Sequence, residues 1–459
     1  MIKIDYRFST KEMIGKNGVE RKELDSVLKK ARAILKKLRE EKRMGKLGVA
    51  NILDEPELVQ KSLELASHYQ GKIENVVVLG IGGSALGART IAQALSPEPF
   101  AQISDKKPKL WVCDNIDPDW LNDIFKISFS SSSLFLVISK SGATAETASQ
   151  LLYLIKRLKE KYGESWKEYL VVITDPEKGL LRNFARVHNL KSLPVPEKVG
   201  GRYSVLSPVG LFPSALIGVE VQELIRGAKD MDKLIFDSGR KTNPAELLAG
   251  IYYRFAQRGK KILVMMPYSS RLNNFSEWFA QLWAESLGKK FSLSNKLIRA
   301  GSTPVRALGA TDQHSQLQLY LEGPEDKLIT FLKLEKFSEA LLIPEPEPGL
   351  EELSWLSGHT IAELFNTELF ATSASLAQEG KPSITITIPE LSGYYLGMLF
   401  YLFELSTVIC AGLWDVNPFD QPGVELGKQY TYGLMKKPGY EKKVKELEKF
   451  RKKGRGYIL

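Results

Sequence analysis

Hydroxyl side chains are concentrated in one short segment, ISKSGATAET, which spans residues 138–147. Ser139, Ser141 and Thr144 follow an apolar run that is typical of a strand, and Lys140 stands among them. Hydroxyls and free backbone amides at the start of a helix bind phosphate oxygens, and the helix dipole favours their negative charge. A helix N-cap would need only one hydroxyl. The cluster therefore predicts a phosphate-binding loop.

A second loop, LGIGGSALGAR, places Gly83 and Ser84 behind another apolar run. Glycines after a strand allow backbone N–H groups to approach a phosphate. The glycine spacing also fits a loose dinucleotide fingerprint, and a nicotinamide-dependent enzyme is one alternative. That alternative leaves the hydroxyl cluster unexplained, and no Gly-Lys-Ser/Thr follows to make a triphosphate loop. We therefore expect both loops to hold one small phosphorylated substrate, with no cofactor.

Glu285 is the first candidate for acid–base chemistry. It follows Trp278 by seven residues and Leu282 by three, so it lies on the apolar face of a helix. Burial is costly for a carboxylate without a partner and tends to raise its pKa, which suits a base that works near neutral pH. Alternatively, the side chain swings outward to pair with Lys289. The helix alone leaves both interpretations open.

Other polar residues stand in separate segments. Arg202 follows two glycines in VGGRYSVLS, and His314 lies in the polar turn GATDQHS. Gln421 and Lys428 flank a turn in FDQPGVELGK. Together they add a cation, a histidine and further polar groups to the candidate base, and no His/Cys/Asp spacing predicts a metal site.

The elements that must position these residues alternate between strands and helices. Short, continuously apolar runs separated by helices are typical of a parallel sheet covered on both faces, so the fold class is α/β. A proline-rich connection divides two such blocks. We predict an N-terminal helical segment (1–50), a first, phosphate-binding domain (51–198) and a connection carrying Arg202 (199–242). A second domain (243–416) and a C-terminal segment with Lys428 and a basic tail (417–459) follow.

The net charge of +10 is confined to two terminal segments. Residues 21–46 and 435–459 each carry a net charge of +7, which leaves −4 for the rest of the chain. The first segment has a single apolar stripe, so its lysines are expected on the outer face of a docked helix. No nucleic-acid motif accompanies them, and no apolar run approaches the length of a membrane span. Two isolated cysteines in apolar contexts favour a reducing, cytoplasmic location.

Six segments together resemble the phosphoglucose isomerase family and occur in the family's order: LGIGGSALGAR, ISKSGATAET, VGGRYSVLS, ESLGK, TDQHS and FDQPGVELGK. The matches cover about residues 75 to 430, which makes the resemblance specific. It implies two sugar-isomerase (SIS-type) domains with doubly wound parallel sheets, a homodimer and no required cofactor. It also implies interconversion of glucose 6-phosphate and fructose 6-phosphate through a cis-enediolate.

The resemblance further implies roles for individual residues. Arg202 would stabilise the enediolate, Glu285 would move the proton between C2 and C1, and Lys428 with a histidine would open the sugar ring. The substrate would be bound or lined by Gly83, Ser84, Ser139, Lys140, Ser141, Thr144, Glu146 and Gln421.

Several alternatives stay open at this point. His314 is favoured for ring opening, although His359 could be supplied by a neighbouring subunit, and Asp312 is the alternative base. The same domains could form a non-catalytic sugar-phosphate-binding protein. An isomerase could also accept mannose 6-phosphate, because the two aldoses differ at one hydroxyl and discrimination depends on pocket shape.

Overall fold

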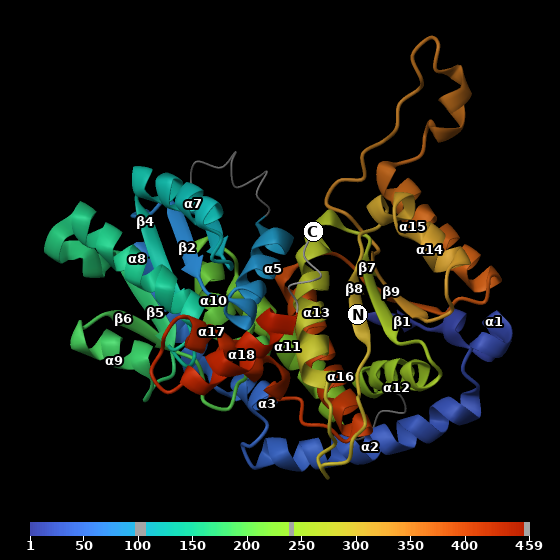
Figure 1. Ribbon diagram of the computed structural model, residues 1–459. Helices are drawn as coiled ribbons and strands as arrows, with labels where there is room; N and C mark the ends of the chain where they lie inside the picture. The colour runs from blue at the N-terminus through green and yellow to red at the C-terminus, as the bar shows by residue number, and fades with distance from the viewer. Residues whose placement is uncertain (97–106, 238–242, 454–459) are drawn as a thin grey trace.

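Two five-stranded sheets form the centre of the computed structural model, which describes residues 1–96, 107–237 and 243–453 (Figure 1). In the first sheet the strand order is β3-β2-β4-β5-β6, and all neighbouring strands are parallel. Its strands are β2 (Asn75–Leu79), β3 (Lys109–Cys113), β4 (Ser133–Ile138), β5 (Leu170–Thr174) and β6 (Lys191–Pro194).

Helices cover both faces of this sheet. They are α4 (Pro56–Tyr69), α5 (Leu86–Leu95), α7 (Pro118–Ser130), α8 (Ala145–Tyr162), α9 (Leu180–Val187) and α10 (Pro208–Leu216). Val76 and Val78 of β2 belong to the core formed with α4 and α10. Val77 and Leu79 belong to the opposite core, formed with α7, α8 and α9. Because successive strand residues face opposite sides, a strand covered on both faces must be apolar throughout, as β2 is.

The second sheet has the order β1-β10-β9-β7-β8. Its strands are β1 (Lys3–Asp5), β7 (Ile262–Pro267), β8 (Thr303–Arg306), β9 (Lys327–Leu334) and β10 (Ser383–Ile388). Only β1 is antiparallel to its neighbour. The N-terminal segment, expected to be helical, thus also contributes an edge strand. Three residues are too few for the sequence to show a strand period.

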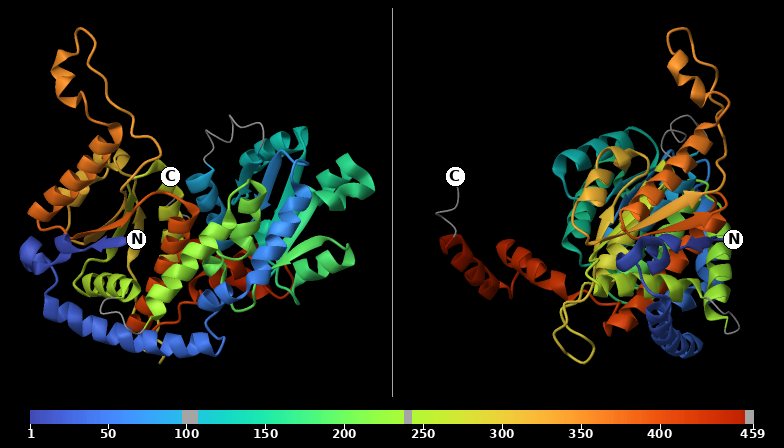
Figure 2. Two further views of the ribbon diagram at one scale, coloured as in Figure 1. Left: turned by 180° about the vertical axis from the view of Figure 1, so that it is seen from behind. Right: turned by 90° about the vertical axis from the view of Figure 1, so that its right-hand side faces the viewer.

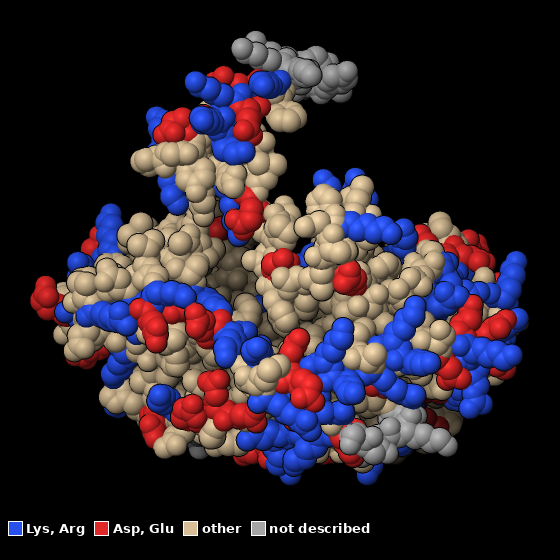
Figure 3. Space-filling view, turned by 90° about the horizontal axis from the view of Figure 1, so that it is seen from below, with Lys and Arg blue, Asp and Glu red and all other residues tan. Residues whose placement is uncertain are grey.

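Two separate cores, one on each face of the second sheet, involve the surrounding helices. These helices are α1 (Lys11–Ile14), α2 (Arg21–Arg43), α3 (Gly48–Asn51), α11 (Val221–Phe236), α12 (Pro244–Gln257), α13 (Asn273–Leu287), α14 (Leu317–Glu322), α15 (Ile361–Gln378) and α16 (Gly393–Trp414). Helix α2 buries the predicted stripe, including Leu24, Ala31 and Leu35. Figure 3 looks onto the face along which α2 runs, and Lys and Arg are numerous there. The lysines of this segment therefore lie on the outer face of a docked helix.

Helix α16 corrects one expectation. It is long and apolar enough to cross a membrane, with 22 residues and a mean hydropathy of 1.8 over its most apolar window, so a run of that length does exist. However, 89% of that window is buried inside the protein. Its neighbours are α11, α12 and α13. The apolar composition is therefore that of a central core helix.

Two segments stand away from the body (Figure 2). The first, here called the arm, comprises residues 340–360 and is closed at its base by a bridge between Leu342 and Thr360. The second, the C-terminal hairpin, comprises α17 (Glu425–Leu434) and α18 (Glu441–Lys453). Both carry large apolar side chains that are exposed in the single chain, such as Trp355 and Met435.

The structure confirms the predicted α/β fold class, because both sheets are mainly or wholly parallel and are covered by helices. Continuously apolar runs form strands such as β2, β4 and β5, as expected of strands covered on both faces. Strands β6 and β8 have no such run, since each has only four residues and contains a proline. The domain boundaries remain predictions. The last five residues of the predicted connection 199–242 and the last six of the basic tail lie outside the described residues.

Candidate active site

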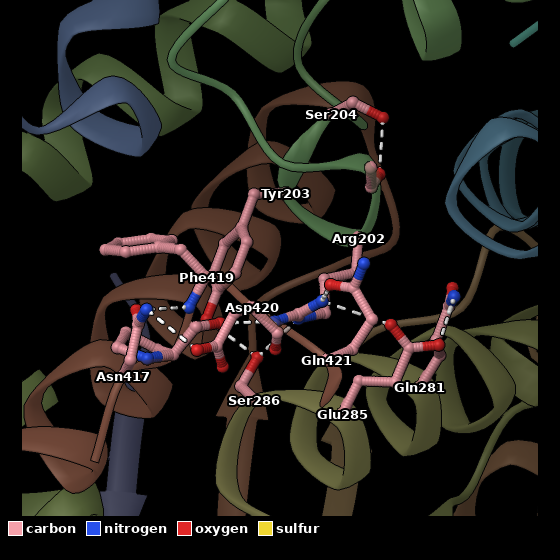
Figure 4. Close-up of polar contacts among 12 residues, drawn as sticks. Arg202, Tyr203, Ser204, Gln281, Glu285, Ser286, Asn417, Phe419, Asp420 and Gln421 are labelled. Carbon is pink, nitrogen blue, oxygen red and sulfur yellow. Dashed lines mark hydrogen bonds and ion pairs between the residues drawn. The ribbon is translucent and has the colours of Figure 1, made fainter. Parts of the chain in front are cut away.

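Arg202 is the centre of a polar cluster formed with residues of α13 and of the segment 417–421 (Figure 4). It lies in the short helix η6 (Gly201–Tyr203), and only 4% of its side chain is exposed. Its Nε donates to Ser286 Oγ at 2.8 Å, and Nη1 donates to Glu285 Oε2 and Gln421 Oε1, both at 3.1 Å. Nη2 donates to the carbonyls of Pro418 and Asp420. All five N–H donors of the guanidinium therefore have acceptors, which fixes the charge in place.

Glu285 contacts this cation from the last turn of α13. Its Oε1 accepts a hydrogen bond from Gln281 Nε2 at 3.0 Å, and 35% of its side chain is exposed. The sequence left open whether the carboxylate faces inward or pairs with Lys289. The structure shows that it faces inward, because Lys289 Nζ binds the backbone carbonyl of Glu285 at 2.7 Å instead. The carboxylate is thus oriented by two donors and still partly open to a ligand.

Lys289 fastens the chain that follows α16 to the end of α13. Its buried ammonium contacts Asp420 through both the backbone carbonyl and the carboxylate, the latter at 3.0 Å. Burial is the main cause that lowers the pKa of Lys289, and Asp420 opposes it. Arg202 binds the same carbonyl of Asp420. Two cations from different segments therefore hold the 417–421 loop, which carries Gln421.

The hydroxyl cluster forms a compact turn between β4 and α8. Ser139 Oγ accepts from the backbone N–H of Gly142 at 3.1 Å and lies 3.3 Å from Thr144 Oγ1. Ser141 is exposed, and Thr144 is half-buried at the N-cap position of α8. The Thr144 side chain makes no capping hydrogen bond. Its hydroxyl is instead paired with that of Ser139, in a long contact in which either oxygen can donate. The pair therefore keeps hydrogen-bonding capacity toward a phosphate oxygen.

The glycine-rich loop packs mainly against protein. A Cβ on Gly83 would overlap the carbonyl of Gly201, and a Cβ on Gly82 would meet the Gln281 amide. The Ser204 hydroxyl also donates to the Gly83 carbonyl at 3.3 Å. These glycines allow the loop to lie directly against the residue before Arg202. Contact of Gly83 and Ser84 with substrate stays a prediction.

Lys140 lies beside the hydroxyl cluster, but its ammonium has protein partners. Nζ is 2.5 Å from the carbonyl of Glu197 and 2.9 Å from that of Val199. Its predicted contact with the substrate phosphate remains a prediction.

Three other predicted site residues make no hydrogen bond to the Arg202 cluster in the described part of the chain. His314 is exposed at the end of η8 (Thr311–His314), and no hydrogen bond of its ring is found in the described part of the chain. Lys428 lies on α17 and pairs with Glu425 at 2.8 Å. Glu146 is half-buried in the first turn of α8. Their roles stay predictions.

The alternative residues are engaged elsewhere. Asp312 accepts hydrogen bonds from the Leu308 N–H at 2.7 Å and from the Ser315 hydroxyl at 2.5 Å. Burial opposes ionisation, but these hydrogen bonds outweigh it and lower the pKa of Asp312. A carboxylate held in this way is a weaker proton acceptor than one that is free. His359 lies at the base of the arm, with Nδ1 3.0 Å from Glu363.

Sequence reasoning missed four members of the cluster: Gln281, Ser286, Lys289 as a loop anchor, and Asp420. Gln281 precedes Glu285 by one helical turn, so the i, i+4 spacing could have indicated their contact. Ser286 and Asp420 had no comparable local signal, because their partner Arg202 is far away in the sequence. No group of three metal-ligating side chains was found within residues 1–96, 107–237 and 243–453.

Comparison with known proteins identifies relatives over almost the whole chain. The profile of the family "Phosphoglucose isomerase" matches residues 57–339 and 361–453. A glucose-6-phosphate isomerase from Carboxydothermus hydrogenoformans is 41% identical over 462 residues, which cover 100% of this chain and 99% of the relative. One from Rubrobacter xylanophilus is 42% identical over 388 residues, covering 84% of this chain and 88% of the relative.

Solved structures agree at the level of the fold. A hypothetical protein from Thermus thermophilus has a TM-score of 0.82 and 34% identity, covering 95% of this chain and 100% of that one. A glucose-6-phosphate isomerase from Chlamydia trachomatis has a TM-score of 0.82 at 22% identity, covering 98% of this chain and 92% of that one. The latter similarity concerns the fold alone.

Proposed function

The chain belongs to the phosphoglucose isomerase family, and from this premise we propose how its residues carry out the reaction. The protein is an aldose–ketose isomerase that interconverts glucose 6-phosphate and fructose 6-phosphate. The reaction moves a proton between C2 and C1 and leaves the overall oxidation state of the sugar unchanged. It therefore needs a base, a cation near the developing enediolate oxygen and an anchor for the phosphate.

We assign the proton transfer to Glu285, and the observation that carries this assignment is its geometry. Arg202 and Gln281 hold one carboxylate oxygen each, at 3.1 and 3.0 Å, while about a third of the side chain stays exposed. A base must be oriented before the substrate arrives, yet remain within reach of the proton that it removes. The carboxylate takes the proton from C2 of the aldose and returns it to C1.

Arg202 supplies the preorganised positive charge. In the free protein every N–H of its guanidinium already has an acceptor. We propose that the enediolate oxygen replaces Gln421 or Glu285 on Nη1, while the bonds to Ser286, Pro418 and Asp420 keep the group in place. Where Glu285 is the group displaced, the substrate frees the base as it engages the cation.

The phosphate is assigned to the loop formed by Ser139, Ser141 and Thr144. The Thr144 hydroxyl, which makes no capping bond to α8, and the start of this helix favour an anion there. Gly83, Ser84, Glu146 and Gln421 are proposed to line the rest of the sugar site.

Ring opening is assigned to His314 together with Lys428. The exposed ring of His314 can exchange a proton with the ring oxygen or the C1 hydroxyl. Lys428 is half-exposed on α17 and follows Gln421 by seven residues. His359 is the alternative, supplied by a second copy of the chain, because it lies where the protruding arm begins.

We further propose that the protein is a homodimer in the cytoplasm. The arm carries four glutamates and no Lys or Arg over residues 340–358, whereas residues 435–459 carry a net charge of +7. Both segments expose large apolar side chains, and a second copy would cover them. The two buried free cysteines fit a reducing compartment.

The test is proton exchange during turnover. The purified, cofactor-free protein is incubated with fructose 6-phosphate in D₂O, and the products are followed by NMR. Deuterium at C2 of newly formed glucose 6-phosphate is expected, because an enediolate intermediate takes its proton from the base. Conversion without any deuterium incorporation would argue against exchange through Glu285. Binding without conversion would favour a non-catalytic sugar-phosphate-binding protein.

A further inference from the structure

The ammonium of Lys140 connects two loops of the proposed site. Lys140 belongs to the phosphate-binding loop, while its acceptors, the carbonyls of Glu197 and Val199, belong to the segment leading to Arg202. An ammonium has three N–H donors, and these two carbonyls take two of them. Burial is the main cause that lowers the pKa of Lys140, while Asp175 and Glu197 raise it. The contact is thus a partly desolvated, charge-assisted one.

The segment that Lys140 holds is fixed at two other points. The intervening carbonyl, that of Lys198, packs so closely on Gly48 that a Cβ there would overlap it. Further along, Gly201 packs on Gly83. Val199 is buried, and only two residues separate it from Arg202. Because only Gly200 and Gly201 lie between them, we expect a shift of the Val199 carbonyl to be passed along this short stretch to the backbone of Arg202.

We propose that Lys140 is a positioning residue that sets the distance between the phosphate-binding loop and Arg202. This inference rests on the proposed function, in which the phosphate is bound by one loop and the enediolate by the other. The phosphate and C1–C2 lie at opposite ends of the sugar. The two loops must therefore keep a fixed separation for Arg202 to meet the negative charge as it develops. A displacement of about 1 Å can cost on the order of 100-fold in rate.

This role differs from direct binding of the phosphate, which the sequence alone predicted for Lys140. Kinetic measurements can distinguish the two roles. A phosphate ligand contributes to binding of any phosphate at the loop, whereas a positioning residue for Arg202 contributes mainly in the transition state.

The experiment compares Lys140→Met with Lys178→Met. Lys178 is the matched control, since it binds the same residue, Glu197, but through the exposed carboxylate at 2.9 Å. For each variant, kcat and KM for fructose 6-phosphate are measured, together with the inhibition constant of inorganic phosphate. We expect Lys140→Met to lower kcat by roughly 10- to 100-fold, with an inhibition constant that changes by less than about threefold. Lys178→Met should have the same kcat, KM and phosphate inhibition constant as the unsubstituted protein.

Two results would overturn the proposal. A large rise in the phosphate inhibition constant with kcat unchanged would make Lys140 a phosphate ligand, and unchanged kinetics would give it no role. If Lys140→Met fails to fold, judged by thermal unfolding, Lys140→Arg replaces it. The guanidinium keeps the charge but not the position of the donors, so kcat should still fall. Absence of turnover in the unsubstituted protein would instead refute the proposed function.

Discussion

At Glu285, the contacts of the carboxylate define what each substitution will change. One oxygen accepts from Arg202 and the other from Gln281. Arg202 is also held by Ser286 and by the carbonyls of Pro418 and Asp420. Gln281 lies one turn before Glu285 on the same helix. A neutral isostere should therefore keep the arrangement while removing the proton acceptor.

We predict that Glu285→Gln lowers kcat by about 10²- to 10⁴-fold, the usual contribution of a general base, with KM changed little. Steady-state kinetics with fructose 6-phosphate checks this. Asp312→Asn is the comparison, and its kcat should stay within about tenfold because its carboxylate is used by Leu308 and Ser315. The opposite ranking of the two variants would make Asp312 the base.

At Arg202, lysine is not a conservative replacement. An ammonium cannot satisfy acceptors that are arranged around a planar guanidinium, so several carbonyl and carboxylate oxygens would lose their donors. We predict that Arg202→Lys lowers kcat by about 10²- to 10³-fold and also lowers the melting temperature. Arg226→Lys, in an exposed pair with Glu223, is the control and should change neither. Equal losses of kcat in Arg202→Lys and Arg226→Lys would contradict the assignment of Arg202 as the cation that stabilises the enediolate.

At the scale of the elements, the glycine-rich loop and η6 are in backbone contact. A Cβ on Gly83 would overlap the Gly201 carbonyl, so Gly83→Ala must push η6 away. We predict a loss of about 1–3 kcal/mol in the free energy of unfolding, accompanied by a fall in kcat because Arg202 moves. Gly427→Ala has open space around its Cβ and is the control. A melting temperature that is unchanged in Gly83→Ala would refute this packing argument.

Helix α16 carries a buried acid that makes stability depend on pH. Glu404 Oε1 is buried without a hydrogen-bond partner in the described part of the chain, and burial raises its pKa well above 4.5. The folded protein thus keeps this proton while the unfolded chain releases it above about pH 4.5, its unfolded value. The stability associated with this group is therefore full below that pH and falls as the pH rises.

Glu404→Gln should remove this dependence. The cost of the buried amide is the same at every pH, so the informative quantity is the variant's melting temperature minus that of the unsubstituted protein. We predict that this difference is more favourable to the variant at about pH 8 than at about pH 5. Thermal unfolding at the two pH values measures it. If this difference in melting temperature is the same at both pH values, Glu404 has the same pKa in the folded and unfolded chains.

At the scale of the whole molecule, the arm and the C-terminal hairpin protrude from the body (Figure 2). The arm is closed at its base by backbone hydrogen bonds between Ile343 and His359 and between Ile361 and Leu341. Replacing residues 344–357 by a short Gly/Ser turn should therefore leave the body folded. If the arm contacts a second copy, its removal should weaken the dimer.

We predict a dimer for the unsubstituted protein and a shift toward monomer for the shortened chain, measured by sedimentation equilibrium. High salt should also weaken the dimer, because the arm is acidic and the C-terminal segment basic. The control is Trp120→Ser, which removes a half-exposed apolar side chain on α7, a helix that belongs to neither segment. A shortened chain that stays dimeric would show that the arm is not the contact.

The sequence by itself determined the α/β class and the chemistry of separate segments. Continuous apolar runs such as β2 and β4 must be covered on both faces, and three hydroxyls at a helix start predict an anion site, because both signals lie within a few consecutive residues. Only the tertiary structure decided which segments meet. Arg202 contacts Glu285 across 83 residues and Gln421 across 219. It also decided that Lys140 faces two carbonyls and that Glu285 turns inward. Such contacts depend on how the helices pack around both sheets, and the spacing of residues along the chain does not predict that packing.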